Sequence, residues 1–248
     1  MSHADIPSMG PERTPAGTKV KQVQGLFDRV AKRYDAMNTI LSLGIHHVWK
    51  RTAMRLLSLG PGDWLIDVCG GTGDLALLSA KHVGNSGRVI LYDMNRAMIE
   101  AGRPRIERSP SRDRIELVLG DAEKISFQDN CFDAAMVGFG IRNLGHMERG
   151  LREMYRVIKP GGKALCLEFS NPSSPLFRSV YDFYSFHVIP LLGSILAGSR
   201  EAYSYLTESI RVFSSPEELA AMMRDIGFRN VLFRRLTRGI ATIHLGDK

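Results

Sequence analysis

Three glycines, Gly70, Gly71 and Gly73, separate an apolar run that contains Asp67 from a helical pattern. Because glycine has no Cβ, the backbone can turn sharply there and present its amide N–H groups to a ligand. The helix that follows adds unpaired N–H groups and a positive dipole end. The run therefore predicts a strand, a ligand-binding turn and a helix, with Asp67 free to orient the ligand or the turn.

A second carboxylate, Asp93, ends the next apolar run, residues 88–92. In an open α/β sheet, an acidic residue at this place binds the hydroxyls of a ribose. The spacing therefore predicts a nucleoside cofactor. Gly71, Gly73 and Ala76 also fit the relaxed dinucleotide fingerprint, so NAD and S-adenosylmethionine both stay open at this step.

The third apolar run favours S-adenosylmethionine. Residues 116–119 lead into Asp121, whose carboxylate would lie beside the adenine and suit its exocyclic amine. A fourth strand at 131–137, a helix at about 146–157 and a fifth strand at 164–169 follow, and this order resembles the class I methyltransferases. The residues expected to bind the cofactor are Asp67, Gly70, Gly71, Thr72, Gly73, Asp93, Met94, Asp121, Ala122 and Gly138.

Several blocks in the rest of the chain resemble the ubiquinone/menaquinone biosynthesis C-methyltransferase family. The resemblance covers roughly residues 20–246 and departs from the general methyltransferase pattern at Cys69, where many members have glycine. It implies transfer of a methyl group from S-adenosylmethionine to a ring carbon of a polyprenyl quinol. Naphthoquinol and benzoquinol substrates both stay open, as do a homo-oligomer and a quinone-synthesis complex. The blocks are FDRVAKRYDAMN (27–38), GIHHVWKR (44–51), FGIRN (139–143), EFS (168–170) and YDFYSFHV (181–188).

Methylation of a ring carbon needs an electron-rich ring, which a quinol gains by losing a phenolic proton. Arg142 and Asn143 follow the fourth strand, where Arg142 can lower the pKa of a phenol and Asn143 can hydrogen-bond a ring oxygen. His187 and Tyr181 are further candidates, since histidine accepts a proton near neutral pH. Hydrogen bonding within loops and ordinary packing are the alternative roles of these residues. An NAD-dependent oxidoreductase and a noncatalytic cofactor-binding subunit are the alternative functions.

One domain, residues 19–248, is expected after a tail, residues 1–18, whose Pro, Gly and Ser content predicts disorder. The fold class is α/β, a seven-stranded and mostly parallel sheet. Its antiparallel edge would come from the runs 228–236 and 239–245. An apolar insertion at about 172–212 would lie over the carboxyl ends of the strands as a substrate lid, or form a helical hairpin that closes the core.

The net charge of +7 comes mainly from residues 1–60, where Lys and Arg interleave with aromatic and aliphatic residues. That pattern fits contact with a membrane surface, and it equally fits a solvated helix face packed by its apolar stripe. No aromatic, glycine-rich motif supports binding to nucleic acid. No apolar run is long enough to span a bilayer. We therefore expect a cytoplasmic protein, with peripheral contact to the inner face of the membrane left open.

The sequence predicts no metal site. Cys69, Cys131 and Cys166 are too widely spaced for a disulfide framework or a zinc site. His46 and His47 are adjacent, so we expect them on diverging faces of a helix, where they cannot share a metal.

Overall fold

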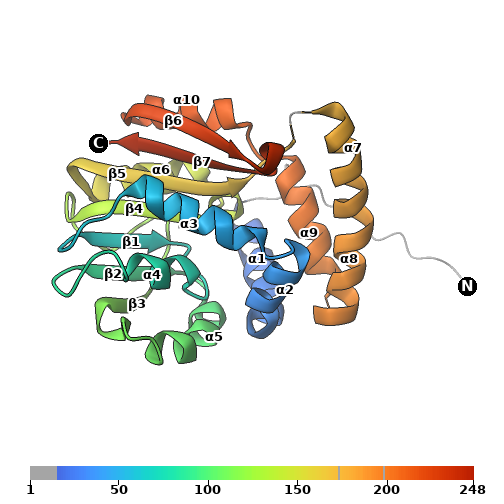
Figure 1. Ribbon diagram of the computed structural model, residues 1–248, viewed down its shortest axis with the longest axis horizontal. Coiled ribbons are helices and arrows are strands. Elements are labelled where there is room, and N and C mark those ends of the chain that lie inside the picture. The colour runs from blue at the N-terminus through green and yellow to red at the C-terminus, as the bar shows by residue number, and fades with distance from the viewer. Residues whose placement is uncertain (1–15, 173, 198) are drawn as a thin grey trace, which may run out of the picture.

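A seven-stranded sheet runs through the molecule in the order β3-β2-β1-β4-β5-β7-β6 (Figure 1). Strands β1 to β5 pair in parallel, and β7 is antiparallel to both of its neighbours. The predicted α/β sheet is confirmed, and its antiparallel strand lies one place in from the outermost strand, β6. The computed structural model describes residues 16–172, 174–197 and 199–248. The strands are β1 (Trp64–Val68), β2 (Arg88–Asp93), β3 (Ile115–Leu119), β4 (Phe132–Gly138), β5 (Ile158–Phe169), β6 (Arg229–Leu236) and β7 (Ala241–Asp247).

Helices cover both faces of this sheet. α3, α4 and α5 pack on one face, and α6 and α10 pack on the other. Successive residues of a strand point to opposite faces, so Leu65 belongs to one apolar cluster and Ile66 to the other. The two clusters make the sheet a fixed platform for the loops at its carboxyl edge. The covering helices are α3 (Ile45–Leu57), α4 (Asp74–Ser79), α5 (Arg96–Glu107), α6 (Met147–Val157) and α10 (Pro216–Ile226).

A third group of helices lies beyond the carboxyl ends of the parallel strands (Figure 1). A separate apolar cluster joins its two parts, because Met37 and Leu41 near the N-terminus pack with Ile189 and Tyr203 of the insertion after β5. The insertion thus lies at the edge of the sheet where the sequence predicts a substrate lid. These helices are α1 (Ala16–Val30), α2 (Tyr34–Leu41), α7 (Pro175–Phe183), α8 (Ile189–Leu192) and α9 (Arg200–Arg211), with the π-helical turns η4 (Tyr184–Val188) and η5 (Gly193–Ala197).

The start of β5 differs from the sequence prediction. The strand begins at Ile158, not at residue 164. The intervening glycine pair still forms backbone hydrogen bonds, since the amide of Gly161 donates to the carbonyl of Lys248. Pairing with Lys248 therefore extends the strand back through residues 158–163, ahead of its predicted start.

The predicted tail lies mostly outside the described residues. Its last three positions, 16–18, form the first turn of α1. Within the described ranges, no helix is both long enough and apolar enough to cross a membrane.

Candidate active site

The turn between β1 and α4 has the backbone that its glycines predict. Gly71 and Gly73 have φ angles of +56° and +83°, which glycine adopts without strain. Cys69 also has a positive φ, +55°, a backbone conformation that glycine would adopt with less strain. The left-handed residues bend the chain so that the amide of Gly71 faces the end of β2.

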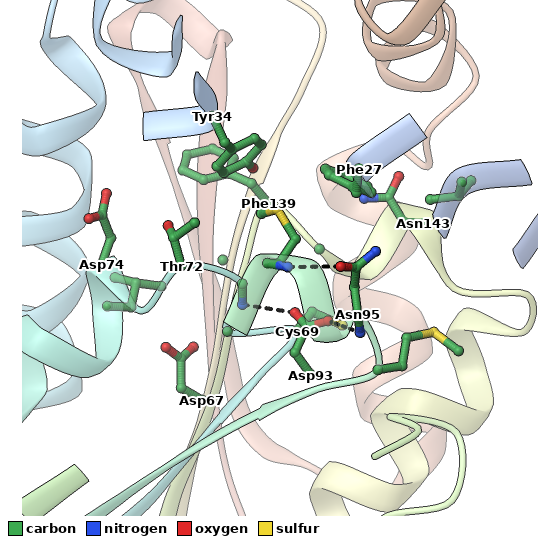
Figure 2. Close-up of a pocket in the computed structure, with 18 of the residues that line it drawn as sticks. Phe27, Tyr34, Asp67, Cys69, Thr72, Asp74, Asp93, Asn95, Phe139 and Asn143 are labelled. Carbon is green, nitrogen blue, oxygen red and sulfur yellow. Dashed lines mark hydrogen bonds between the residues drawn. The ribbon is translucent and has the colours of Figure 1, made fainter. Parts of the chain in front are cut away.

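Asp93 holds this turn from the end of β2 (Figure 2). Its Oδ2 accepts a hydrogen bond from the amide of Gly71 at 2.8 Å, and its Oδ1 accepts one from the amide of Asn95 at 2.7 Å. Asn95 in turn caps α5 by accepting from the amide of Met98. Withdrawal from water raises the pKa of Asp93. Each carboxylate oxygen can accept a further bond, so the geometry suits the predicted contact with a ribose.

Asp67, near the end of β1, is a buried carboxylate without a partner. Neither oxygen has a hydrogen-bond partner among the described residues. Burial raises the pKa of Asp67 to about 8. Since an unpaired buried charge is costly, the site fits a ligand that brings positive charge. The ammonium and sulfonium groups of S-adenosylmethionine supply such charge.

These carboxylates border a cavity of about 870 Å³ at the carboxyl ends of β1, β2 and β4. Its cover comes from α1, where Val20, Val23 and Phe27 face it. The family resemblance implies that the N-terminal helical segment folds over the cofactor, whereas residue spacing alone does not indicate it. The predicted cofactor residues that line the cavity are Asp67, Gly70, Gly71, Thr72, Asp93, Met94 and Gly138.

The remaining predicted cofactor residues lie elsewhere. Gly73 packs behind the turn, where a Cβ would press on Leu91 and Ile106. Asp121 is exposed, and its Oδ1 accepts a hydrogen bond from the amide of Glu123 at 2.9 Å. Ala122 is buried in the apolar core beneath α6. The structure therefore does not bring Asp121 or Ala122 to the wall of this cavity.

Gly102 supports the turn from α5, and the sequence analysis missed it. A Cβ at this position would overlap the backbone of Thr72. Gly102 lies inside α5, where glycine is otherwise unfavourable. The presence of a glycine inside a helix was thus the feature of the sequence that could have indicated close packing at Gly102.

A network of charged side chains joins the N-terminal helices to the same turn. Asp35 of α2 accepts a hydrogen bond from the hydroxyl of Thr72 at 2.6 Å and pairs with Arg105 at 3.1 Å. Arg105 also pairs with Asp74 at 2.5 Å, and Lys50 of α3 pairs with Asp74 at 2.6 Å. These contacts fasten α2 and α3 beside the cofactor cavity.

A second and larger cavity of about 1800 Å³ adjoins the first. Apolar side chains of α1 to α3 and of the insertion make up most of its wall, together with Phe169 at the end of β5. The wall thus combines the insertion, where the sequence predicts an apolar lid, with the N-terminal helices. The two cavities share wall residues, which are Phe27, Tyr34, Asn38, Lys50 and Phe139.

Arg142 lies in the wall of the apolar cavity. Its Nη1 donates to Glu168 and to the carbonyl of Phe139, both at 2.6 Å, and its guanidinium lies over the ring of Phe169. Both members of the ion pair with Glu168 are buried. No hydrogen bond to a described residue involves Nη2 of Arg142. The guanidinium is therefore held rigidly and keeps donor capacity.

Asn143 and Tyr181 lie on the walls of different cavities. Asn143 lines the cofactor cavity, and its Oδ1 accepts a hydrogen bond from the hydroxyl of Tyr205 at 3.2 Å. Tyr181 lines the apolar cavity, and burial raises its pKa. His187 lies outside both, exposed and stacked on Phe183.

The prediction that His46 and His47 diverge is wrong. Their ring centroids are 3.9 Å apart. Thr39 explains this, because its hydroxyl lies 3.2 Å from Nε2 of His46 and 3.4 Å from Nε2 of His47. In the part of the chain that the structure describes, no group of three or more His, Cys, Asp or Glu side chains could hold a metal.

Replacement of Asp67 should alter how stability depends on pH. The folded state keeps this carboxyl protonated up to about pH 8, whereas the unfolded state releases the proton above pH 3.8, the ordinary pKa of an aspartate side chain. Stability of the cofactor-free protein should therefore fall with rising pH in that window, by up to about 1.4 kcal/mol per unit. Asp67→Asn should remove this slope in urea unfolding, and the exposed variant Asp225→Asn should keep it. Equal slopes in Asp67→Asn and the parent would contradict the assignment.

Gly102→Ala should distort the ligand-binding turn. Since the added methyl meets backbone atoms of Thr72, we expect a loss of about 1–3 kcal/mol in unfolding free energy. Calorimetric titration should show S-adenosylmethionine binding about tenfold more weakly. Gly25→Ala in α1 is the matched control, because its Cβ would meet nothing within 4 Å. Equal behaviour of the two variants would show that Gly102 does not support the turn.

Comparison with known proteins agrees with this architecture. The ubiE/COQ5 methyltransferase family model matches residues 16–248. The chain is 44% identical to the ubiquinone/menaquinone biosynthesis C-methyltransferase UbiE of Ectopseudomonas mendocina, over 96% of this chain and 93% of that protein. It is 41% identical to the protein of the same name from Hydrogenovibrio crunogenus, over 96% of this chain and 94% of that protein.

Solved structures share the fold at much lower identity. A SAM-dependent methyltransferase from Aquifex aeolicus has a TM-score of 0.58 and 17% identity, over 79% of this chain and 88% of that one. The [4+2]-cyclase SpnF has a TM-score of 0.67 and 17% identity, over 92% of this chain and 96% of that one. The family match also decides between the two cofactors left open above in favour of S-adenosylmethionine. The chain belongs to the ubiE/COQ5 methyltransferase family and is an S-adenosylmethionine-dependent methyltransferase.

Proposed function

We propose that the enzyme methylates a ring carbon of a polyprenyl quinol in menaquinone or ubiquinone biosynthesis, working at a membrane surface. The observation that carries the proposal is the large apolar cavity beside the cofactor cavity. A small polar acceptor would not need such a wall, whereas a prenyl chain does. The relatives from Ectopseudomonas mendocina and Hydrogenovibrio crunogenus are named as C-methyltransferases of ubiquinone/menaquinone biosynthesis, which supports the proposal.

The shared wall is where the two reactants meet. S-adenosylmethionine supplies a methyl group on a positively charged sulfur that is already a good leaving group. The protein has to align the acceptor carbon with that methyl group and exclude water. Phe27, Tyr34 and Phe139 border both cavities and can carry out both tasks. Asp67 and Asp93 hold the cofactor from the opposite side, at the ends of β1 and β2.

Arg142 makes the acceptor ring nucleophilic. A quinol hydroxyl with a pKa near that of tyrosine, ~10, is rarely ionised at neutral pH. A guanidinium donor in an apolar wall lowers that pKa, because its hydrogen bond to the oxyanion is stronger where the surroundings screen charge poorly. Glu168 fixes the orientation of Arg142, so the unshared Nη2 can donate to the developing oxyanion.

A direct assay tests the proposed function. The purified protein is incubated with labelled S-adenosylmethionine and either demethylmenaquinol or a methoxy-polyprenyl benzoquinol. Transfer of label to a ring carbon of at least one acceptor is expected. No transfer to either quinol, under conditions where the protein binds S-adenosylmethionine, would rule the function out.

Arg142→Lys separates catalysis from cofactor binding. The variant keeps the charge but loses the planar fork that lets one nitrogen bind Glu168 while another faces the ring oxygen. We expect turnover to fall about 100-fold with unchanged S-adenosylmethionine affinity, and to recover partly at higher pH. Arg149→Lys on the exposed face of α6 is the control. A pH–rate profile parallel to that of the parent would reduce Arg142 to a structural residue.

A further inference from the structure

Leu43 occupies an unfavourable position in the turn between α2 and α3. Its side chain is 90% exposed, and its backbone has a φ of +49°. A left-handed backbone is strained for leucine, and exposure to water gives no compensation. Leu43 also lines the apolar cavity, so it stands at the mouth of that cavity. Strain and exposure together indicate a contact outside the isolated chain.

Further apolar side chains are exposed beside this mouth. Val48, one turn into α3, is 51% exposed. On the insertion, Phe183, Leu191 and Ile195 are exposed at spacings of eight and four residues along one continuous run of helical turns. The two segments touch, since the hydroxyl of Tyr184 donates to the carbonyl of Leu41 at 2.9 Å.

Basic side chains accompany the apolar ones. Arg51 and Arg55 follow Val48 at helical spacing and are exposed on the same face of α3. Neither side chain makes an ion pair or hydrogen bond with a described residue. Residues 36–62 contain no Asp or Glu, so this part of the surface is purely cationic. Such a face complements an anionic surface.

Two cationic residues of α1 are already bonded within the protein. Lys19 donates to the carbonyls of Arg142 and Leu144, and Arg29 pairs with Glu201. These bonds hold α1 against the rest of the protein. Lys19 and Arg29 are therefore engaged within the protein, whereas Arg51 and Arg55 of α3, like the exposed Lys21 of α1, have the freedom to meet a partner.

We propose that these residues form a docking rim that seats on an anionic lipid bilayer. The rim places the cavity mouth against the hydrocarbon, so a prenyl chain can enter without crossing water. The proposal rests on the proposed function, because a polyprenyl substrate resides in the bilayer. The docking rim consists of Leu43, Val48, Arg51, Arg55, Phe183, Leu191 and Ile195.

Vesicle flotation tests the apolar part of the rim. Leu43→Glu and Leu191→Glu should each lower the partition coefficient on phosphatidylglycerol/phosphatidylcholine vesicles by about tenfold or more. Leu232→Glu on β6 is the matched control, because Leu232 is 53% exposed and lies on the outermost strand, away from the mouth. Unchanged S-adenosylmethionine affinity verifies that each variant is folded. Parent-like binding of both rim variants, or an equal loss in Leu232→Glu, would overturn the proposal.

Lipid charge tests the basic part. The double variant Arg51→Gln/Arg55→Gln should bind the anionic vesicles about 25-fold more weakly, at roughly fivefold for each arginine. It should match the parent on pure phosphatidylcholine. An equal loss on both kinds of vesicle would overturn the role assigned to charge.

A short-chain, water-soluble quinol separates docking from chemistry. Leu191→Glu, outside the walls of both cavities, should methylate it at the parent rate and lose activity only on long-chain quinol in vesicles. Loss of both activities would overturn the docking role of Leu191. If the parent methylates no quinol, the proposed function fails, while flotation still decides whether the rim binds lipid.

Discussion

The hydrogen bond between the amide of Gly71 and the carboxylate of Asp93 is the constraint on which the site depends. It forms only if β1 and β2 end at the same level, and their parallel register ensures this by pairing Val68 with Tyr92. The same carboxylate accepts from Asn95, which starts α5. Sheet register therefore fixes the turn, the second carboxylate and the helix that packs behind them as one unit.

The N-terminal helices complete what the sheet begins. Asp35 bonds to Thr72 of the turn, Asp28 accepts from Asn95, and Lys19 reaches the loop after β4. Each bond joins the helical cover to a different loop at the carboxyl edge. The cover is also a wall of the apolar cavity, since Phe27 and Tyr34 border both spaces. The same N-terminal helices consequently close the cofactor cavity and shape the acceptor site.

Local patterns made the core of the fold predictable, whereas long-range packing did not. Strand, glycine turn and carboxylate are neighbours in sequence, so the place of Asp93 followed from spacing alone. The fit of Gly102 against Thr72 joins residues distant in the chain, and only the folded backbone reveals it. For the same reason His187, inside an aromatic block, resembled a cavity residue, yet the helix turns its ring outward onto Phe183. Asp121 likewise lies just after a strand, but its carboxylate accepts a hydrogen bond within its own loop.

The apolar cavity and the charge in its wall support one another. A guanidinium alone in such a wall would carry a large desolvation cost, and Glu168 offsets it with a buried ion pair of little net charge. The pair lets a prenyl chain lie nearby without facing an uncompensated charge. The apolar wall that the prenyl chain requires also screens charge poorly. The remaining N–H donor of the guanidinium therefore stabilises an ionised phenol more strongly than it would in water. Hence the apolar wall that binds the prenyl chain is also the environment in which Arg142 can lower the pKa of a quinol hydroxyl.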